Sequence, residues 1–439
     1  MNQTSTAWPD TPKPAGESAI PDHLEAPPTS GKTLAFFYCL AAFSIGLIRT
    51  TTISLVGAMP IGELILLVVV GHALLWLALT RRSPAPLPSP RLLALFIFCQ
   101  LVAFGSYIVT DLWRESIPVD MIRGWLRMIF VLIDIGGLAL IFGGASRAFL
   151  FLQIGAGLSF AQLLIAPPTF GDYWKFGFGY PATTLVFLLA PRVLGFWGAP
   201  LACFALGGLH SVMDFRSLAA ICVAIGGLLL LRIVPRLARK LLMVLAALVF
   251  IVSSPVIFQK MFADTGGRAD RSNVERLAML AAAWEGFVES PIIGQGSWFG
   301  KSQVMDNFLL IRADKAHAAG GAMHFKDDDF EGIAIHSQLF VTLAEAGLFG
   351  ATFFFVYGGF IIWALWFALT DAAWHWTLPS RVFILVSGFW DLWMSPFSGP
   401  VRVNIALIVI LIALFWRERS QQRAGLPAQP PAGLPASTA

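Results

Sequence analysis

Charged residues are scarce in this chain of 439 residues: Asp, Glu, Lys and Arg make up 13% of it, whereas 57% of the residues are hydrophobic. Soluble globular domains carry about 25% charged residues, so this composition excludes that class. The formal net charge of +4 is small and spread over many short polar segments, which gives no support to nucleic-acid binding. The composition indicates an all-α, polytopic integral membrane protein.

Cysteine is also rare, and the pattern of the four cysteines excludes a disulfide framework. All four lie inside apolar runs, where cysteine usually serves as a small packing residue. A P-loop, a glycine-rich dinucleotide-binding pattern and the Ser-His-Asp order of known hydrolases are absent as well. The cysteines are Cys39, Cys99, Cys203 and Cys222.

Apolar stretches of about twenty residues are long enough to cross a bilayer as helices, and we expect about twelve of them. A disordered cytoplasmic tail is expected at 1–32 and another at 417–439, because both are polar and rich in proline. Nine spans fall within 33–258 and three within 336–416, separated by one large loop at 259–335. The expected spans are 34–56, 61–80, 91–111, 124–144, 147–166, 177–191, 194–212, 217–233, 240–258, 338–368, 380–395 and 402–416.

The distribution of Lys and Arg predicts the orientation, because cytoplasmic loops hold the excess of these residues. It favours a cytoplasmic N-terminus, which places the loop at 259–335 on the periplasmic or outer side of the membrane. Several cations then lie on the outer side, where topology does not require them. These are Arg114, Arg123, Lys175, Arg216, Arg276 and Arg402.

Arg216 opens the eighth expected span, in the stretch "HSVMDFRSLAA". Such an arginine can extend toward lipid headgroups or pair with the nearby Asp214. It can also bind a phosphate through two parallel hydrogen bonds, as chemistry on a membrane-bound pyrophosphate requires.

Arg276 lies in the large loop, at the expected start of an amphipathic helix that ends near Pro291. An arginine in the first turn opposes the helix dipole, which suggests an anionic partner. The apolar face of this helix is expected to consist of Leu277, Leu280, Ala281, Trp284 and Phe287.

His336 stands at the start of "HSQLFVTLAEAGLFG", directly after a polar loop. A histidine there can be an ordinary residue at a helix start. As a neutral imidazole on the outer side, it can instead accept the proton of a sugar hydroxyl. Should His336 not be the base, Asp214, Glu331 and Glu345 are the other candidates.

Other acidic residues are weaker candidates. The run Asp327–Asp329 resembles a divalent-metal site, but adjacent side chains point in different directions, which favours a solvated loop. Acidic residues in or near spans can form a proton path, although pairing inside the bundle is the simpler interpretation, for example of Asp134 with Arg127. The acidic residues in question are Glu63, Asp134 and Asp391.

The order of these motifs resembles the O-antigen ligase and O-antigen polymerase superfamily of bacterial membrane glycosyltransferases. Its pattern is Arg-x3-Trp, then Pro-x2-Gly-x-Gly, a variable loop, and a His-Asn pair leading to Glu-x-Gly-x2-Gly. Here it corresponds to Arg276-x3-Leu280, "PIIGQG", His336-Ser337 and "EAGLFG". Leu280 and Ser337 depart from the pattern. Arg216 matches a further Ser-Arg-Ser/Thr-Ala stretch of the superfamily, with phenylalanine in place of the serine.

The resemblance implies a GT-C-like enzyme that transfers a glycan from undecaprenyl diphosphate, with inversion and without a metal or cofactor. His336 would be the general base, Arg216 and Arg276 would bind the diphosphate, and Lys175 and Arg402 could assist. The acceptor would be another lipid-linked repeat in a polymerase, which we favour, or lipid A-core in a ligase. A chain-length regulator is a possible protein partner. A polysaccharide flippase or transporter is the alternative from another class, although such proteins tend to show internal repeats.

Overall fold

The computed structural model describes residues 29–49, 51–54, 58–164, 172–245, 248, 252, 268–299 and 335–424. These residues form a helical bundle with one small antiparallel strand pair, β1 (Thr52–Ser54) and β2 (Ala58–Pro60). Seven helices in these ranges are long and apolar enough to cross a membrane. The expected all-α, multi-pass membrane architecture is therefore confirmed, while fewer full-length spans are found than the twelve expected.

Most expected spans have a matching helix. Four of these helices have a proline at their first or second residue, which suits the first turn because the missing N–H of proline would have no partner there. The matching helices are α2 (Ile61–Thr80), α3 (Pro90–Arg114), α4 (Pro118–Gly144), α7 (Arg216–Leu230, followed by η3, Leu231–Ile233), α13 (Leu378–Met394) and α14 (Gly399–Arg423).

The first expected span is shorter than predicted. Helix α1 (Thr29–Leu47) ends well before residue 56, and the chain then forms β1 and β2. The run Thr51-Thr52-Ile53 explains the change, because β-branched residues favour extended backbone. At the other end of the chain, α14 continues past Trp416, so helices extend into both segments expected as tails.

The middle of the chain combines short and broken helices. Helix α5 (Ala148–Leu158) is followed by a 3₁₀ turn, η1 (Ser159–Leu164). A π-helical turn, η2 (Trp174–Phe178), leads into α6 (Gly179–Val212), which is broken at Gly195 (φ 65°, ψ −150°). Glycine adopts this backbone conformation readily. The break divides α6 into two halves, which correspond to the sixth and seventh expected spans.

The tenth expected span, 338–368, consists of a short helix followed by a long one. The structure has α11 (Gln338–Gly350) and α12 (Thr352–Thr370), with Gly347 inside α11 in a non-helical conformation (φ 65°, ψ −162°). The ninth expected span, 240–258, lies mostly outside the described residues.

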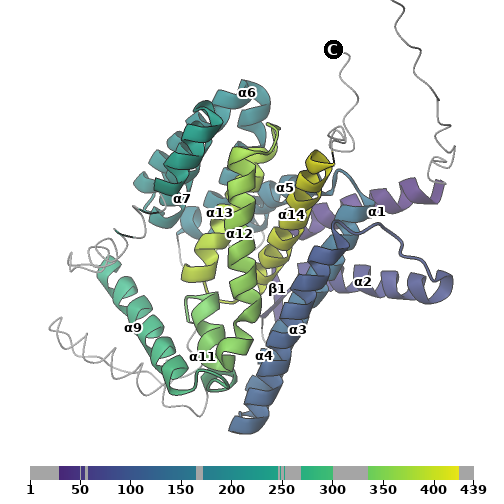
Figure 1. The fold of residues 1–439 in the computed structure, drawn as a ribbon, viewed down its shortest axis with the longest axis vertical. Helices are drawn as coiled ribbons and strands as arrows, with labels where there is room; N and C mark the ends of the chain where they lie inside the picture. The colour runs from purple at the N-terminus through teal and green to yellow at the C-terminus, as the bar shows by residue number, and fades with distance from the viewer. Residues whose placement is uncertain are drawn as a thin grey trace, which may run out of the picture.

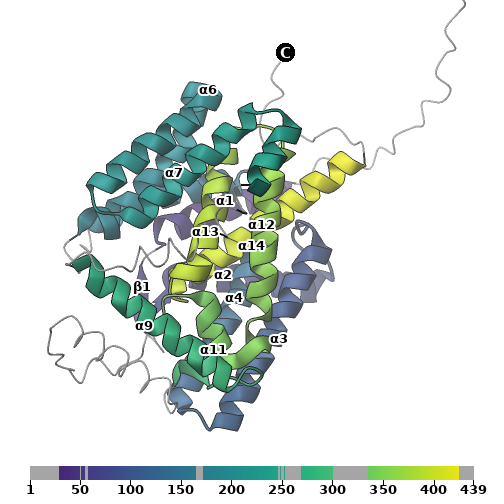
Figure 2. The ribbon, with the colours of Figure 1, turned by 60° about the vertical axis from the view of Figure 1, so that its left-hand side comes forward.

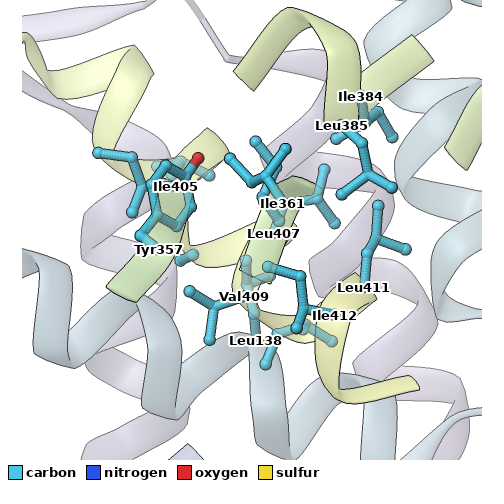
Figure 3. Packing of buried hydrophobic residues seen from close by; sticks show 14 of the residues in the cluster. Leu138, Tyr357, Ile361, Ile384, Leu385, Ile405, Leu407, Val409, Leu411 and Ile412 are labelled. Atoms are coloured by element: carbon cyan, nitrogen blue, oxygen red, sulfur yellow. The ribbon is translucent and has the colours of Figure 1, made fainter. Parts of the chain in front are cut away.

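Helix α14 forms the centre of the bundle. In the most apolar 18-residue stretch of α14, 72% of the residues are buried inside the protein. The corresponding share is 22% in α2, which lies at the periphery. Figure 3 shows Ile405, Val409 and Ile412 of α14 packed with Leu138 of α4 and Tyr357 of α12. A helix that is apolar on all sides is stable only inside a protein or a membrane, which accounts for the position of α14.

The bundle has two different ends. At the loop end, where α3 ends and α4 begins, Arg114 Nε donates to Gly294 O at 3.0 Å and so contacts the large loop. At the basic end, where α12 ends, Arg239 donates to Leu369 O at 2.7 Å. Helix α9 (Arg268–Glu289) and α11 lie side by side at the loop end in both views (Figures 1 and 2).

Helix α9 confirms that the large loop contains a helix, but two details of the prediction are wrong. The helix begins at Arg268, so Arg276 lies well inside it and the dipole argument does not apply. The buried face is made of Ala282, Ala283 and Gly286, with Phe287 of the predicted face packed beside it, whereas Trp284 is 51% exposed and contacts Phe340 at its edge. Small residues allow close approach between helices, and this explains why they form the contact.

Candidate active site

A direct backbone contact joins the segment after α9 to α11. Gln295 N donates to Ala344 O at 2.9 Å, and Gly296 N donates to Glu345 O at 2.9 Å. In return, Leu348 N donates to Pro291 O at 2.8 Å. We call this contact, between residues 291–297 and 344–348, the junction. It unites the "PIIGQG" and "EAGLFG" stretches, which are far apart in the sequence.

Glycine is required at the junction for two reasons. Gly294 and Gly347 have φ angles of 83° and 65°, in the left-handed region that favours glycine. A Cβ atom at Gly294 would also lie 2.5 Å from Glu345 O, and one at Gly347 would lie 2.3 Å from Ile292 O. The spacing of glycines in both stretches is thus a consequence of two backbones in close contact.

Glu345 anchors the junction to the bundle. Tyr107 Oη donates to Glu345 Oε2 at 2.6 Å, and Arg127 forms an ion pair with the same oxygen. Trp298 N donates to Glu345 Oε1 at 3.0 Å. With both oxygens engaged and the side chain 1% exposed, Glu345 is a structural residue and a poor candidate for the base. The expected pairing of Arg127 with Asp134 is wrong, because Arg127 binds Glu345.

Asp111 of α3 provides a second anchor. Its carboxylate accepts from Ser297 N at 2.7 Å, from Ser297 Oγ at 2.8 Å and from Trp125 Nε1 at 2.9 Å. The next residue, Trp298, has φ 61°, which is rare for a bulky side chain. Several hydrogen bonds therefore hold a strained turn in one conformation, and the end of α9 is fixed to α3 and α4.

His336 lies at the entrance to α11 but does not cap it. The N-cap is Ser337, whose Oγ accepts from Phe340 N at 3.2 Å and donates to Leu392 O of α13 at 3.1 Å. Serine and asparagine are similarly good N-caps, so Ser337 can replace the asparagine of the superfamily pattern. His336 is thereby free of a capping role and is held beside the end of α13.

The positive charge of Arg276 acts on His336. The pKa of His336 is lowered from 6.5, first by burial and then by the positive charge of Arg276. Both effects disfavour the imidazolium ion. His336 is therefore neutral near pH 7, in the protonation state that a general base needs.

Arg216 lies at the start of α7 and is 71% exposed. Its Nε is 2.9 Å from Asp214 Oδ1, so the pairing considered from the sequence is present. An exposed pair of this kind stabilises a protein little and can exchange for a better anionic ligand. Within the described ranges, no direct contact joins Arg216 to His336 or Arg276.

The two auxiliary candidates have different environments. Lys175 belongs to η2, and its Nζ lies 5.5 Å from the centroid of the Phe176 ring. Arg402 is buried in the bundle, where its Nε and Nη2 donate to the two carboxylate oxygens of Glu63 at 2.7 and 2.9 Å. This bidentate pair favours a structural role for Arg402.

Two residues at the loop end were not singled out by the sequence reasoning. Arg127, buried beside Glu345, was considered only as a partner of Asp134. Arg49 falls inside the expected first span, yet an arginine at the outer end of an apolar stretch is itself a signal. The structure places Arg49 beyond the end of α1, in a cavity that Asp391 also lines.

A metal site has no support among the described residues, since they contain no group of three or more His, Cys, Asp and Glu side chains that could hold an ion. The run Asp327–Asp329 and the alternative base Glu331 lie outside these residues. The four cysteines are free thiols, as expected.

The comparison with known protein families agrees with this arrangement. Residues 201–355 match the family described as O-antigen ligase. No curated protein is found to match the chain. The matched range contains Arg216, Arg276, His336 and both halves of the junction. This match supports the resemblance drawn from the sequence motifs over residues 201–355 of the chain.

Proposed function

We propose that this protein is a membrane glycosyltransferase that transfers a glycan from undecaprenyl diphosphate to an acceptor hydroxyl at the periplasmic face of the inner membrane. The observation that carries the proposal is the pairing of a neutral His336 with the cationic Arg276 inside the family-matched range. A base and a diphosphate-binding cation are the two groups that this reaction needs from the protein.

The transfer is a single displacement at the anomeric carbon. A ring nitrogen of His336 accepts the proton of the acceptor hydroxyl while the hydroxyl oxygen forms a bond to the anomeric carbon. The bond from that carbon to the diphosphate oxygen breaks, and its electron pair leaves with the diphosphate. Attack opposite the leaving group inverts the anomeric configuration.

The arginines act on the leaving group. Negative charge builds up on the diphosphate as the bond breaks, and guanidinium groups stabilise it through charge-assisted hydrogen bonds. Arg276, whose charge acts on His336, would bind the diphosphate in this way. Arg216 would exchange its exposed contact with Asp214 for the phosphate oxygens, and Lys175 lies in the turn before α6 as a further cation.

The acceptor decides between two biological outcomes of the same chemistry. We propose polymerisation of O-antigen or exopolysaccharide repeats, in which the acceptor is the terminal sugar of another lipid-linked repeat. Ligation to lipid A-core is the second candidate, favoured by the description of the matched family as O-antigen ligase.

Purified protein with a synthetic undecaprenyl-diphosphate glycan tests the proposal. We expect release of undecaprenyl diphosphate together with a product of inverted anomeric configuration, measured by mass spectrometry and NMR, and unchanged by a chelator. Lipid-linked repeat and lipid A-core, supplied separately, distinguish polymerase from ligase. Movement of the intact donor across vesicles without bond cleavage would instead identify a flippase.

The orientation can be tested in cells. The donor and acceptor glycans meet in the periplasm, so a cysteine at Gly320 should react with a membrane-impermeant reagent added from outside. A cysteine at Leu426 should react only after the membrane is opened. Labelling of the Gly320 variant from the cytoplasmic side alone would refute the proposed mechanism.

A further inference from the structure

Arg49 is a cation inside the helical bundle that the proposed mechanism does not use. It follows the end of α1, and its guanidinium carbon lies 5.9 Å from the centroid of the Tyr180 ring. Together with Asp391 of α13 and Asn404 of α14, it lines a cavity between the helices. Several helices therefore place polar groups around one arginine.

The Arg49 guanidinium has no hydrogen-bond acceptor and no ion-pair partner within bonding distance among the described residues. It lies beside the ring of Tyr180. The nearest acidic residue, Asp391, accepts from Ser395 Oγ at 2.6 Å. A guanidinium has five N–H donors, and leaving them without acceptors in a membrane protein is costly. Arg49 is only partly buried.

The position of Arg49 links two parts of the candidate site. The Tyr180 ring that contacts Arg49 also contacts Phe215, with ring centroids 5.8 Å apart, and Phe215 precedes Arg216. On the other side, Asp391 precedes Leu392, whose carbonyl accepts from Ser337, the neighbour of His336. Arg49 thus lies between the turn that carries Arg216 and the turn that carries His336.

We propose that Arg49 is a third diphosphate-binding arginine, which contacts the donor from the side of α1. This inference rests on the proposed function and adds a residue outside the family-matched range. A diphosphate ester carries several oxygens that accept from guanidinium groups. With Arg216 and Arg276 on other elements, Arg49 would complete a set of cations around the leaving group. The Tyr180 ring packs between Arg49 and Phe215, the neighbour of Arg216.

Binding of undecaprenyl diphosphate to purified protein in nanodiscs is the direct test. Arg49→Gln should weaken binding by at least about tenfold, the loss expected when a charge-assisted contact is removed. Arg49→Lys should recover only part of it, because an ammonium group cannot bind two oxygens in parallel. Arg192→Gln is the matched control, since Arg192 lies over Trp376, 5.0 Å from the ring centroid, away from the site. It should leave binding unchanged.

A second variant separates ligand binding from internal charge balance. If Arg49 serves only to neutralise Asp391, the double change Arg49→Gln with Asp391→Asn should restore both protein abundance and binding, and this result would overturn the inference. If Arg49 binds the diphosphate, the double variant should fold normally and still bind weakly. Circular dichroism and size-exclusion chromatography report the fold independently of the ligand.

The same binding measurement on Arg216→Gln distinguishes a failure of the role of Arg49 from a failure of the proposed function. If Arg216→Gln weakens binding while Arg49→Gln does not, the role of Arg49 is refuted and the proposed function stands. If neither change affects binding, the diphosphate donor itself is refuted, and the role of Arg49 with it.

Discussion

Arginines at the two ends of the bundle have different partners. At the basic end, Arg232 donates to Ala368 O and to Ala372 O, the latter at 2.8 Å, and Arg239 donates to Leu369 O at 2.7 Å. At the loop end, the arginines proposed to bind phosphate have no such buried acceptors within the described residues. These are Arg49, Arg216 and Arg276.

The difference has a physical origin. The last carbonyls of a helix have no partner within the helix and lie at its negative end, so arginines are favourable ligands for them. Arg232 and Arg239 satisfy the end of α12 in this way. A cation without such a structural role needs another anion. The hydrogen-bond partners of an arginine therefore indicate whether it is structural or functional. They do so better than the side of the membrane on which it lies.

The largest effect is expected at His336. His336→Ala removes the base and should lower turnover by about a hundredfold to ten-thousandfold, with donor binding and protein abundance nearly unchanged. His375→Asn at the basic end is the matched control. A His336→Ala enzyme that kept more than about a tenth of wild-type turnover, short of this expected loss, would make His336 an ordinary residue at a helix start.

The comparison of arginines predicts a difference between the ends. Arg216→Lys and Arg276→Lys should each lower turnover by about a hundredfold or more, nearly as much as alanine, because lysine cannot reproduce a two-pronged contact with phosphate. Arg236→Lys at the basic end, where Arg236 pairs with Asp371, should have little effect. Normal glycan assembly in cells with either loop-end lysine variant would show that these arginines only contact lipid headgroups.

The junction predicts a loss of stability. Glu345→Gln leaves the buried Arg127 without its counter-charge, which typically costs about 3–5 kcal/mol. The melting temperature should fall, and turnover with it, because Arg276 and His336 are no longer held together. Asp120→Asn, which weakens the more exposed pair with Arg123, serves as the control. An unchanged melting temperature for Glu345→Gln would mean that the junction does not depend on this ion pair.

The smallest effect concerns pH. A general base works only when neutral, so activity should fall on the acid side as pH drops through the pKa of His336, which lies below 6.5. Arg276→Gln removes one cause of the lowered pKa. The acid limb of the residual activity should then move to higher pH. A limb at the wild-type position would place Arg276 too far from His336 to act on it.

The helices and motifs could be predicted from local patterns in the sequence. The length of the apolar stretches indicated the membrane spans, and the polar residues around His336 indicated the start of α11. The break at Gly347 was missed because glycine is common in membrane helices and only its contact with Ile292 shows why it is needed. The start of α9 was misplaced because no strong capping residue marks it.

Pairings across the chain were beyond reach of the sequence alone. Arg127 meets Glu345, and Arg402 meets Glu63, through helices that are distant in the sequence. Periodicity says which residues share a face but not which helix lies opposite. For this reason the nearer pairing of Arg127 with Asp134 was predicted, and Arg49 was overlooked.

The junction has a consequence for variation among related chains. It holds residues on both sides of the segment 300–334, so the length of that segment does not determine where Arg276 and His336 lie. Changing the length of the chain between two fixed points is inexpensive, at about 0.6 kcal/mol for each doubling of that length. Insertions, deletions or exchanges within 300–334 should therefore leave the junction, and the positions of Arg276 and His336 on either side of it, unchanged.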